Sequence, residues 1–326
     1  MESGPLPSHE NVDFLKLQQM FFAKLEGENK SLNTLKNYRT DLDCFHHYLL
    51  EKKHADPLAK FSLPHVKAYG EYLDEKYTSD NSRRRRVQAL RLFFDFLVEQ
   101  KVFPSNPVRL IPTSPKFLDR PRPTPFVDVK TLWFYLLEEE KQTSDMARLT
   151  TLRNQVIMLL IYEGGLKVSD LATLKRSDLF LDGAPRVMLT PSKREPYTIP
   201  LPELFKTVFT TYEVLLKKAL RKVDLDYDFV LFNANPHRIL AGGLSSRGLE
   251  MIFEHYRKKL MIVLTPKSLR QACIFKWLGE EKPESLLKEW LGFAPSYSLK
   301  PYLDLKNEFQ YNPDALVQIT QQLRKH

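Results

Sequence analysis

Residues 264–305 hold an arginine, a lysine and a tyrosine whose side chains could act together on a phosphate. Thr265 predicts the start of a helix that carries Arg270, because the apolar residues after it recur at helical spacing. A second helix is expected to end at Gly292, and Tyr302 follows it. Cations bind the non-bridging oxygens of a phosphate, and a hydroxyl can attack phosphorus as a nucleophile. The segment therefore predicts phosphate chemistry.

The same segment resembles the C-terminal signature of the tyrosine recombinases, the family of the phage integrases and Xer proteins. The family pattern is Thr-Pro-His-x-Leu-Arg-His, followed by Leu-Gly-His and then by the nucleophilic tyrosine. This chain has Thr265-Pro266-Lys267-Ser268-Leu269-Arg270-Gln271, then Leu291-Gly292-Phe293, and then Tyr302. The order and spacing match, whereas several side chains of the pattern are replaced.

Two of the six catalytic positions that this resemblance implies carry the family's own residues. Tyr302 would be the nucleophile, and Arg270 would be one of two arginines that bind the scissile phosphate. A third position lies on a β-hairpin, where the family has a lysine. Lys193 is our candidate for that lysine, but the alignment slips by one residue here and leaves Arg194 as an alternative.

The other three positions carry different side chains. Lys167 stands where the family has its second arginine, Lys267 replaces a histidine, and Phe293 replaces a histidine or tryptophan. A lysine keeps the positive charge but lacks the planar guanidinium fork, and a phenylalanine has no hydrogen-bond donor. Each lost donor typically slows such a reaction by about 10²–10³-fold. The sequence therefore leaves open whether the site still cleaves.

The resemblance implies a reaction without a metal or nucleotide cofactor, in which a tyrosine oxygen attacks a DNA phosphate and forms a 3′-phosphotyrosine. A 5′-hydroxyl then reverses the attack and rejoins the strands. We expect an Xer- or integrase-like recombinase of site-specific recombination or integration. The alternatives are a relative that binds a recombination site without cleaving it, and a basic helical RNA-binding or scaffold protein. The implied partners are double-stranded DNA and further subunits, in a homo- or hetero-oligomer (a tetramer on DNA) joined through the C-terminal helix at residues 313–326.

The composition indicates a basic protein of two domains with an ordinary apolar content. The chain has 326 residues, a formal net charge of +9 and a hydrophobic share of 43%. This length allows two cores, and the excess of cations suits a polyanion such as nucleic acid. No apolar run approaches the length of a membrane span, and the N-terminus lacks a signal-peptide pattern, so a cytoplasmic location is expected. Cys44 and Cys273 are expected to be buried free thiols.

The first domain, residues 1–111, is expected to be an all-α, four-helix module, and it also resembles the family's core-binding domain. One helix should follow an N-cap at Asn33, with apolar residues every three or four positions along it. Another carries the arginine run 83–86 in its first turn, where positive charge opposes the helix dipole unless a polyanion binds. A solvated charged cap is the alternative. The DNA-binding candidates are Lys36, Arg39, Arg83, Arg84, Arg85, Arg86, Lys116 and Arg120.

Residues 112–125 are rich in proline and predict an extended basic linker. The second domain, residues 126–326, should be mixed, with short strands at residues 186–201 and 228–232 forming a small antiparallel sheet. The fold class implied is mainly α, with an all-α SAM-like core-binding domain followed by an α+β catalytic domain of the tyrosine-recombinase type. We expect the two domains to form a C-shaped clamp around duplex DNA, hinged at the linker.

Overall fold

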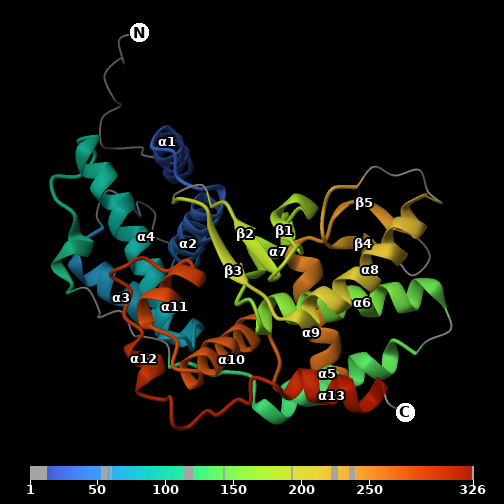
Figure 1. Cartoon of the computed structure of the whole chain (residues 1–326). Coiled ribbons are helices and arrows are strands. Elements are labelled where there is room, and N and C mark those ends of the chain that lie inside the picture. The colour runs from blue at the N-terminus through green and yellow to red at the C-terminus, as the bar shows by residue number, and fades with distance from the viewer. Residues whose placement is uncertain are drawn as a thin grey trace. The chain divides into compact units, whose positions relative to one another are not determined.

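Figure 1 shows the computed structural model of the chain, which describes residues 13–52, 58, 61–112, 120–141, 144–191, 194–221, 227–234 and 239–324. The chain divides into two compact units, Met1–Leu118 and Asp119–His326, each with its own hydrophobic core. The predicted fold class is confirmed. The described part of the first unit is helical, and the second unit combines helices with two small antiparallel sheets. None of the described helices is both long enough and apolar enough to cross a membrane.

The first unit is built from α1 (Phe14–Gly27), α2 (Leu32–Glu51), α3 (Leu63–Lys76), α4 (Asp80–Glu99) and the short 3-10 helix η1 (Pro107–Leu110). The start of α2 differs from our expectation. The hydroxyl of Ser31 accepts the N–H of Thr34, so Ser31 is the N-cap and Asn33 lies inside the helix. The apolar stripe of α2 is confirmed, because Leu42, Phe45 and Leu49 are buried.

We had expected the arginine run in the first turn of its helix. In the structure the run follows the first turn of α4. The helix begins at Asp80, whose negative charge is favourable at that end of the helix dipole. Arg83 forms ion pairs with Asp80 and with Asp74. Arg86 is buried, and its guanidinium carbon lies 3.7 Å from the ring centroid of Tyr77. Part of the run therefore belongs to the structure of the first unit.

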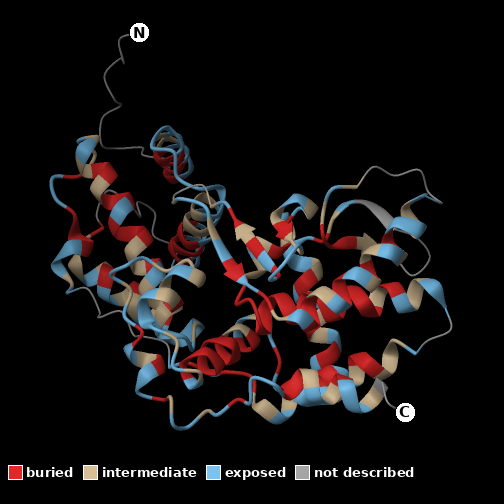
Figure 2. Cartoon of the chain, viewed as in Figure 1, coloured by how far each residue is buried: buried red, intermediate tan, exposed pale blue. Residues whose placement is uncertain are grey.

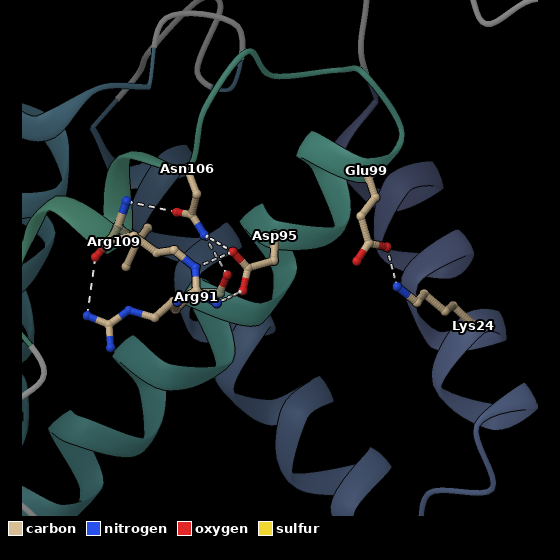
Figure 3. Close-up of polar contacts among 7 residues, drawn as sticks. Lys24, Arg91, Asp95, Glu99, Asn106 and Arg109 are labelled. Carbon is tan, nitrogen blue, oxygen red and sulfur yellow. Dashed lines mark hydrogen bonds and ion pairs between the residues drawn. The ribbon is translucent and has the colours of Figure 1, made fainter.

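A polar network joins the C-terminal half of α4 to η1, as Figure 3 shows. The carboxylate of Asp95 accepts two hydrogen bonds of 2.6 Å from the guanidinium of Arg109 and one of 2.8 Å from the amide of Asn106. Arg91, one turn earlier on α4, donates to the carbonyl of Ile111 at 2.7 Å. Bidentate, charge-assisted bonds of this kind are among the stronger polar contacts in proteins. They fix the last described segment of the first unit against α4.

The second unit begins with two helices and a three-stranded sheet, and ends with helices that carry the predicted signature. Its elements are α5 (Phe126–Glu139), α6 (Asp145–Tyr162), α7 (Val168–Thr173), η2 (Arg176–Asp178), β1 (Leu179–Phe180), β2 (Arg186–Leu189), β3 (Tyr197–Pro200), α8 (Glu203–Arg221), β4 (Phe232–Ala234), β5 (Ile239–Gly243), α9 (Ser246–Leu260), α10 (Pro266–Gly279), α11 (Glu284–Trp290), α12 (Lys300–Leu303) and α13 (Ala315–Arg324).

The helices α6 and α10 form the centre of the second core, and Figure 2 shows both as largely buried. Every residue of α6 from Leu152 to Tyr162 is buried, and so is every residue of α10 from Leu269 to Leu278 except Arg270. The two helices contact each other, and α6 also packs against α5 and α8. Cys273 of α10 is a buried free thiol, as predicted, and so is Cys44 of the first unit. The helix that carries Arg270 is therefore held on most of its circumference.

The sheet confirms one predicted pair of strands and corrects another. β2 and β3 pair antiparallel within the predicted range 186–201, with β1 on the other side of β2. The strand expected at residues 228–232 lies further along the chain, at β4, where it pairs with β5. The preceding residues pair instead with the loop before η2, since the N–H of Val230 donates to the carbonyl of Leu174 at 2.9 Å. Their backbone groups are thus satisfied outside a regular sheet.

The C-terminal helix α13 packs on α5 of the same chain. The indole N–H of Trp133 on α5 donates to the carbonyl of Leu316 at 3.1 Å and to the hydroxyl of Thr320 at 3.0 Å. Trp133 is completely buried and Thr320 is nearly so. The chain end thereby covers an apolar face of the second unit.

Candidate active site

Arg270 lies at the point where three segments of the second unit meet. Thr265 caps α10 by accepting the N–H of Ser268 at 2.9 Å, which confirms the predicted helix start. The Arg270 side chain donates from Nε to the carbonyl of Gly165 at 2.5 Å and from Nη2 to the carbonyl of Leu291 at 2.7 Å. Within the described part of the chain its other terminal nitrogen, Nη1, makes no hydrogen bond. The guanidinium is therefore fixed by two loops with one nitrogen left to bind an anion.

Two glycines allow those loops to approach Arg270. Gly165 has a φ of +64° and Gly292 a φ of +63°, a region that side chains rarely adopt. A Cβ on Gly165 would lie 2.9 Å from an atom of the Trp277 ring. The predicted helix stop at Gly292 is confirmed, because α11 ends at Trp290 and Gly292 adopts the left-handed conformation that follows it.

Three polar side-chain groups lie close to Gly292. A Cβ at this position would lie 2.8 Å from the hydroxyl of Tyr197, 3.5 Å from Nη1 of Arg194 and 3.6 Å from Nζ of Lys167. These groups come from β3, from the β2–β3 loop and from the residue before α7. The absence of a side chain on Gly292 therefore lets two cations and one hydroxyl pack closely around it, and groups of this kind suit the oxygens of a phosphate.

The cations repel one another in the absence of an anion. Burial lowers the pKa of Lys167, and the neighbouring charge of Arg270 lowers it further. Burial also lowers the pKa of Arg270, although Asp170 opposes this effect. Asp170 accepts the backbone N–H of Lys167 at 2.9 Å, so its negative charge is held inside the cluster. The single carboxylate of Asp170 does not balance the positive charges of the cluster, and a bound phosphate would neutralise more of them.

Of the two candidates for the hairpin cation, Arg194 is the one that the structure describes. Its guanidinium carbon lies 4.0 Å from the ring centroid of Tyr197, and Nη2 donates to the carbonyl of Glu289 at 3.3 Å. Lys193 lies outside the described residues. The position that sequence reasoning held as the alternative is thus the one seen beside Lys167 and Gly292.

Phe293 and Lys267 occupy different places relative to Arg270. The ring of Phe293 lies with its centroid 5.5 Å from the Arg270 guanidinium carbon and stacks on Tyr297 at 4.1 Å between centroids. It therefore forms a wall of the site but offers no hydrogen bond. Lys267 is exposed in the first turn of α10, three positions before Arg270.

The predicted nucleophile, Tyr302, is buried on the short helix α12, with 7% of its surface exposed. Burial raises the pKa of its hydroxyl, while the neighbouring Gln271 side chain and the charge of Arg270 lower it. The carbonyl oxygen of the Gln271 side chain accepts the N–H of Arg122 at 3.0 Å. Tyr302 lies within electrostatic range of Arg270.

Sequence reasoning missed three members of the site. Tyr197 was seen only as an apolar residue of a strand, Asp170 only as part of the string after Gly165, and Gln271 only as the residue after Arg270. A partial signal existed for Asp170, because an acidic residue three positions after a helix cap commonly accepts a backbone N–H. The other two contacts depend on how distant segments meet.

The DNA-binding candidates of the first unit differ in exposure. Lys36 and Arg39 are exposed on α2, away from its buried stripe. Arg85 is exposed but forms an ion pair of 2.9 Å with the fully buried carboxylate of Asp41. Arg84 is half-buried. Of the remaining candidates, Arg120 forms an ion pair with Glu308 in the second unit, and Lys116 lies outside the described residues.

Comparison with known families identifies both halves of the chain. Residues 136–308 match the model of the phage integrase family, and residues 19–101 match that of the phage integrase N-terminal SAM-like domain. This chain belongs to the phage integrase family. The predicted family is thereby confirmed, and a basic RNA-binding or scaffold protein is no longer favoured.

Curated relatives of this phage integrase family member are tyrosine recombinases. The chain is 34% identical to XerC of Myxococcus xanthus, over 51% of this chain and about half (53%) of that protein. It is 28% identical to XerC of Halalkalibacterium halodurans over 84% of this chain and 86% of the relative. XerD of Listeria monocytogenes is 26% identical, with 87% and 94% covered. These relatives carry the name of the function class that was expected from the sequence.

Solved structures share the fold of this phage integrase family member. A lambda integrase dimer bound to a COC′ core site superposes with a TM-score of 0.63 at 16% identity, covering 90% of this chain and 77% of that one. The XerH site-specific recombinase bound to its difH substrate gives a TM-score of 0.62 at 14% identity, with 92% and 82% covered. At these identities the likeness concerns the fold.

Proposed function

We propose that this chain is an Xer-like tyrosine recombinase that cuts and rejoins duplex DNA through a 3′-phosphotyrosine. The observation that supports this most directly is the polar cluster around Gly292, where Lys167 and Arg194 lie together within electrostatic range of Arg270. Such a cluster is unfavourable without an anion, and Tyr302 lies in the electrostatic range of Arg270. The arrangement provides cations for a phosphate and a hydroxyl close to them.

The proposed reaction begins when the scissile phosphate binds to the cations Arg270, Lys167 and Arg194. The oxygen of Tyr302 bonds to phosphorus, its proton is released to solvent, the bond from phosphorus to the 5′ oxygen breaks, and that oxygen takes a proton. Arg270 and Lys167 stabilise the negative charge that spreads over the non-bridging oxygens as this happens. Attack by a 5′-hydroxyl from another strand reverses the steps and releases Tyr302. No metal or nucleotide is needed, because the phosphodiester energy is kept in the tyrosine ester.

The second candidate function is a DNA-binding relative that occupies a recombination site without cleaving it. Lys167 stands where the family has an arginine, and Phe293 stands where it has a histidine or tryptophan. These replacements favour the non-cleaving candidate, since each lost donor typically slows catalysis by about 10²–10³-fold. The burial of Tyr302 also keeps its hydroxyl from phosphate until α12 adjusts. Both candidate functions require that the cation cluster binds a DNA phosphate. They differ in whether Tyr302 forms a covalent bond with it.

For the assembly, we propose that several subunits act together on DNA. The lambda integrase and XerH structures named above contain DNA, and the former is a dimer. In a single chain α13 covers Trp133 of its own α5. We propose that α13 leaves this face in the assembly and covers the same face of a neighbouring subunit, which keeps Trp133 buried without new contact chemistry.

The decisive experiment uses nicked duplexes that trap the phosphotyrosine. Duplexes bound by the full chain are selected from a random library, and a nick is placed in the bound sequence so that the short 5′-ended strand diffuses away after cleavage. We expect a covalent protein–DNA adduct with the natural chain. We expect none with Tyr302→Phe, which should bind the same duplex with unchanged affinity.

Two outcomes would count against cleavage by Tyr302. Tight binding by the natural chain without any adduct would leave the non-cleaving candidate. An adduct that persists in Tyr302→Phe would place the nucleophile elsewhere in the chain.

A further inference from the structure

The hydroxyl of Tyr197 belongs to the polar cluster around Gly292 and has no part in the reaction described above. A Cβ at Gly292 would lie 2.8 Å from this hydroxyl, closer than to either neighbouring cation. Among the residues that the structure describes, the hydroxyl makes no hydrogen bond. Tyr197 is half-buried at the start of β3, with its hydroxyl next to Gly292 and its ring packed against the core.

The ring of Tyr197 is held in this orientation from one side by Arg194. The guanidinium carbon lies 4.0 Å from the ring centroid, a distance typical of a cation–π contact. The backbone is held as well, because Tyr197 pairs with Leu189 in the β2–β3 ladder. A hydroxyl placed in this way loses little conformational freedom when it binds a ligand.

The hydroxyl keeps its proton near neutral pH. Burial raises the pKa of Tyr197, and the negative charge of Asp170 raises it further, while Arg194 and Arg270 oppose the shift. A neutral phenol donates one hydrogen bond, and phosphate oxygens accept strongly. Phe293, whose ring lies beside the Arg270 guanidinium, has no hydrogen-bond donor in its side chain.

We propose that Tyr197 binds the phosphate directly, by donating a hydrogen bond from its hydroxyl to a non-bridging oxygen of a phosphate that pairs with Lys167 and Arg194. It thereby supplies a neutral donor in a site where Phe293 provides none. This inference rests on the proposed function only for the statement that the phosphate belongs to DNA. Binding of a phosphate by Tyr197 does not require that Tyr302 cleave.

The first test measures binding of inorganic phosphate to the full-length chain by calorimetry. Tyr197→Phe removes the hydroxyl and keeps the ring, and we expect the dissociation constant to rise by about tenfold, as for a hydrogen bond to a charged group. The melting temperature without phosphate should stay unchanged. Tyr135→Phe is the matched control, because its hydroxyl bonds to Glu139 at 2.6 Å on α5, and it should leave phosphate binding unaltered.

The second test measures the rate of adduct formation on the nicked duplex. Tyr197→Phe should slow it by about 10²-fold, the typical loss for one donor to a developing charge. The variant should be equally slow on a duplex with sulfur in place of the bridging 5′ oxygen, since a sulfur leaving group needs no acid. A rate restored by sulfur would assign Tyr197 to the leaving group and overturn the proposal.

The two tests separate this inference from strand cleavage. If the natural chain forms no adduct and Tyr197→Phe still weakens phosphate binding, the assignment of Tyr197 stands and cleavage fails. If Tyr197→Phe changes neither phosphate binding nor the adduct rate, the assignment is overturned even in an active recombinase. Failure of the natural chain to bind phosphate also overturns it.

Discussion

At the residue scale, the site keeps its positive charge while it loses hydrogen-bond geometry. The Nζ of Lys167 would lie 3.6 Å from a Cβ on Gly292, within the polar cluster, and its ammonium can neutralise a phosphate as a point charge. It cannot form the paired bonds that a guanidinium makes with two phosphate oxygens. Phe293 fills a wall and donates nothing. Charge brings the phosphate into the site, whereas the number and direction of donors set the rate of its reaction.

Restoring the donors should therefore speed the reaction. We expect Lys167→Arg combined with Phe293→His to raise the single-turnover rate of adduct formation by roughly 10²-fold. Lys258→Arg, the same change on the exposed side of α9, is the control and should have no effect. If the natural chain gives no adduct, the double variant should produce a detectable one. A double variant slower than the natural chain would show that the site is built around the smaller lysine head group.

At the element scale, an ion pair buried between α6 and α10 supports the loop that carries Lys167. Glu163 caps the C-terminus of α6, directly before Gly164, and pairs with Lys276 of α10. Both side chains are buried, with 8% and 3% of their surfaces exposed. A buried pair of this kind contributes modestly to stability while complete, but it leaves a costly isolated charge when one partner is removed.

Breaking this pair should destabilise the second unit strongly. We expect Lys276→Met to lower the free energy of unfolding by about 3–5 kcal/mol in urea titrations of the full chain. Adding Glu163→Gln should recover much of the loss, because the uncompensated carboxylate is then gone. Lys258→Met, which breaks an exposed pair with Glu254 on α9, should leave stability nearly unchanged. A double variant no more stable than Lys276→Met would refute the charge-based explanation.

The helices were predictable from the sequence because local signals specify them. Thr265 caps α10 and Gly292 ends the segment after α11, both as predicted, and the apolar spacing marked the buried faces. The prediction of a strand at residues 228–232 was wrong, because the backbone before β4 pairs with a loop. The residue pattern does not reveal this pairing. Arg270 and Lys167 were predictable from their motifs. Tyr197 was not, because its place beside Gly292 depends on how a hairpin and a distant loop pack.

At the scale of the whole molecule, the net charge of +9 is distributed over cations with different duties. In the arginine run, Arg86 is buried and Arg85 neutralises the buried Asp41, so these two residues support the fold of the first unit. Lys36 and Arg39 are exposed on α2, although the guanidinium carbon of Arg39 also lies 4.9 Å from the ring centroid of Phe22. Exposed cations are the ones that can release condensed counterions from DNA, and this release makes binding depend on salt.

Duplex binding should therefore respond to the exposed cations and to salt. We expect the double variant Lys36→Gln with Arg39→Gln to bind specific and random duplexes more weakly by similar factors. Its salt dependence, the slope of log K against log salt, should fall by about one for each phosphate that is no longer neutralised. Arg86→Gln is the matched control and should lower the melting temperature without this change of slope. Affinity that does not vary with salt would contradict phosphate binding by the natural chain.

The geometry at Gly292 also bears on how this position can change during evolution. Its backbone conformation excludes most side chains by strain, and even a single methyl group would clash with the hydroxyl of Tyr197. A substitution there would push Tyr197 away from Arg194 and Lys167 without removing any group that reacts. In a mutational survey, such a position behaves as strictly as a catalytic residue although it contributes no side chain.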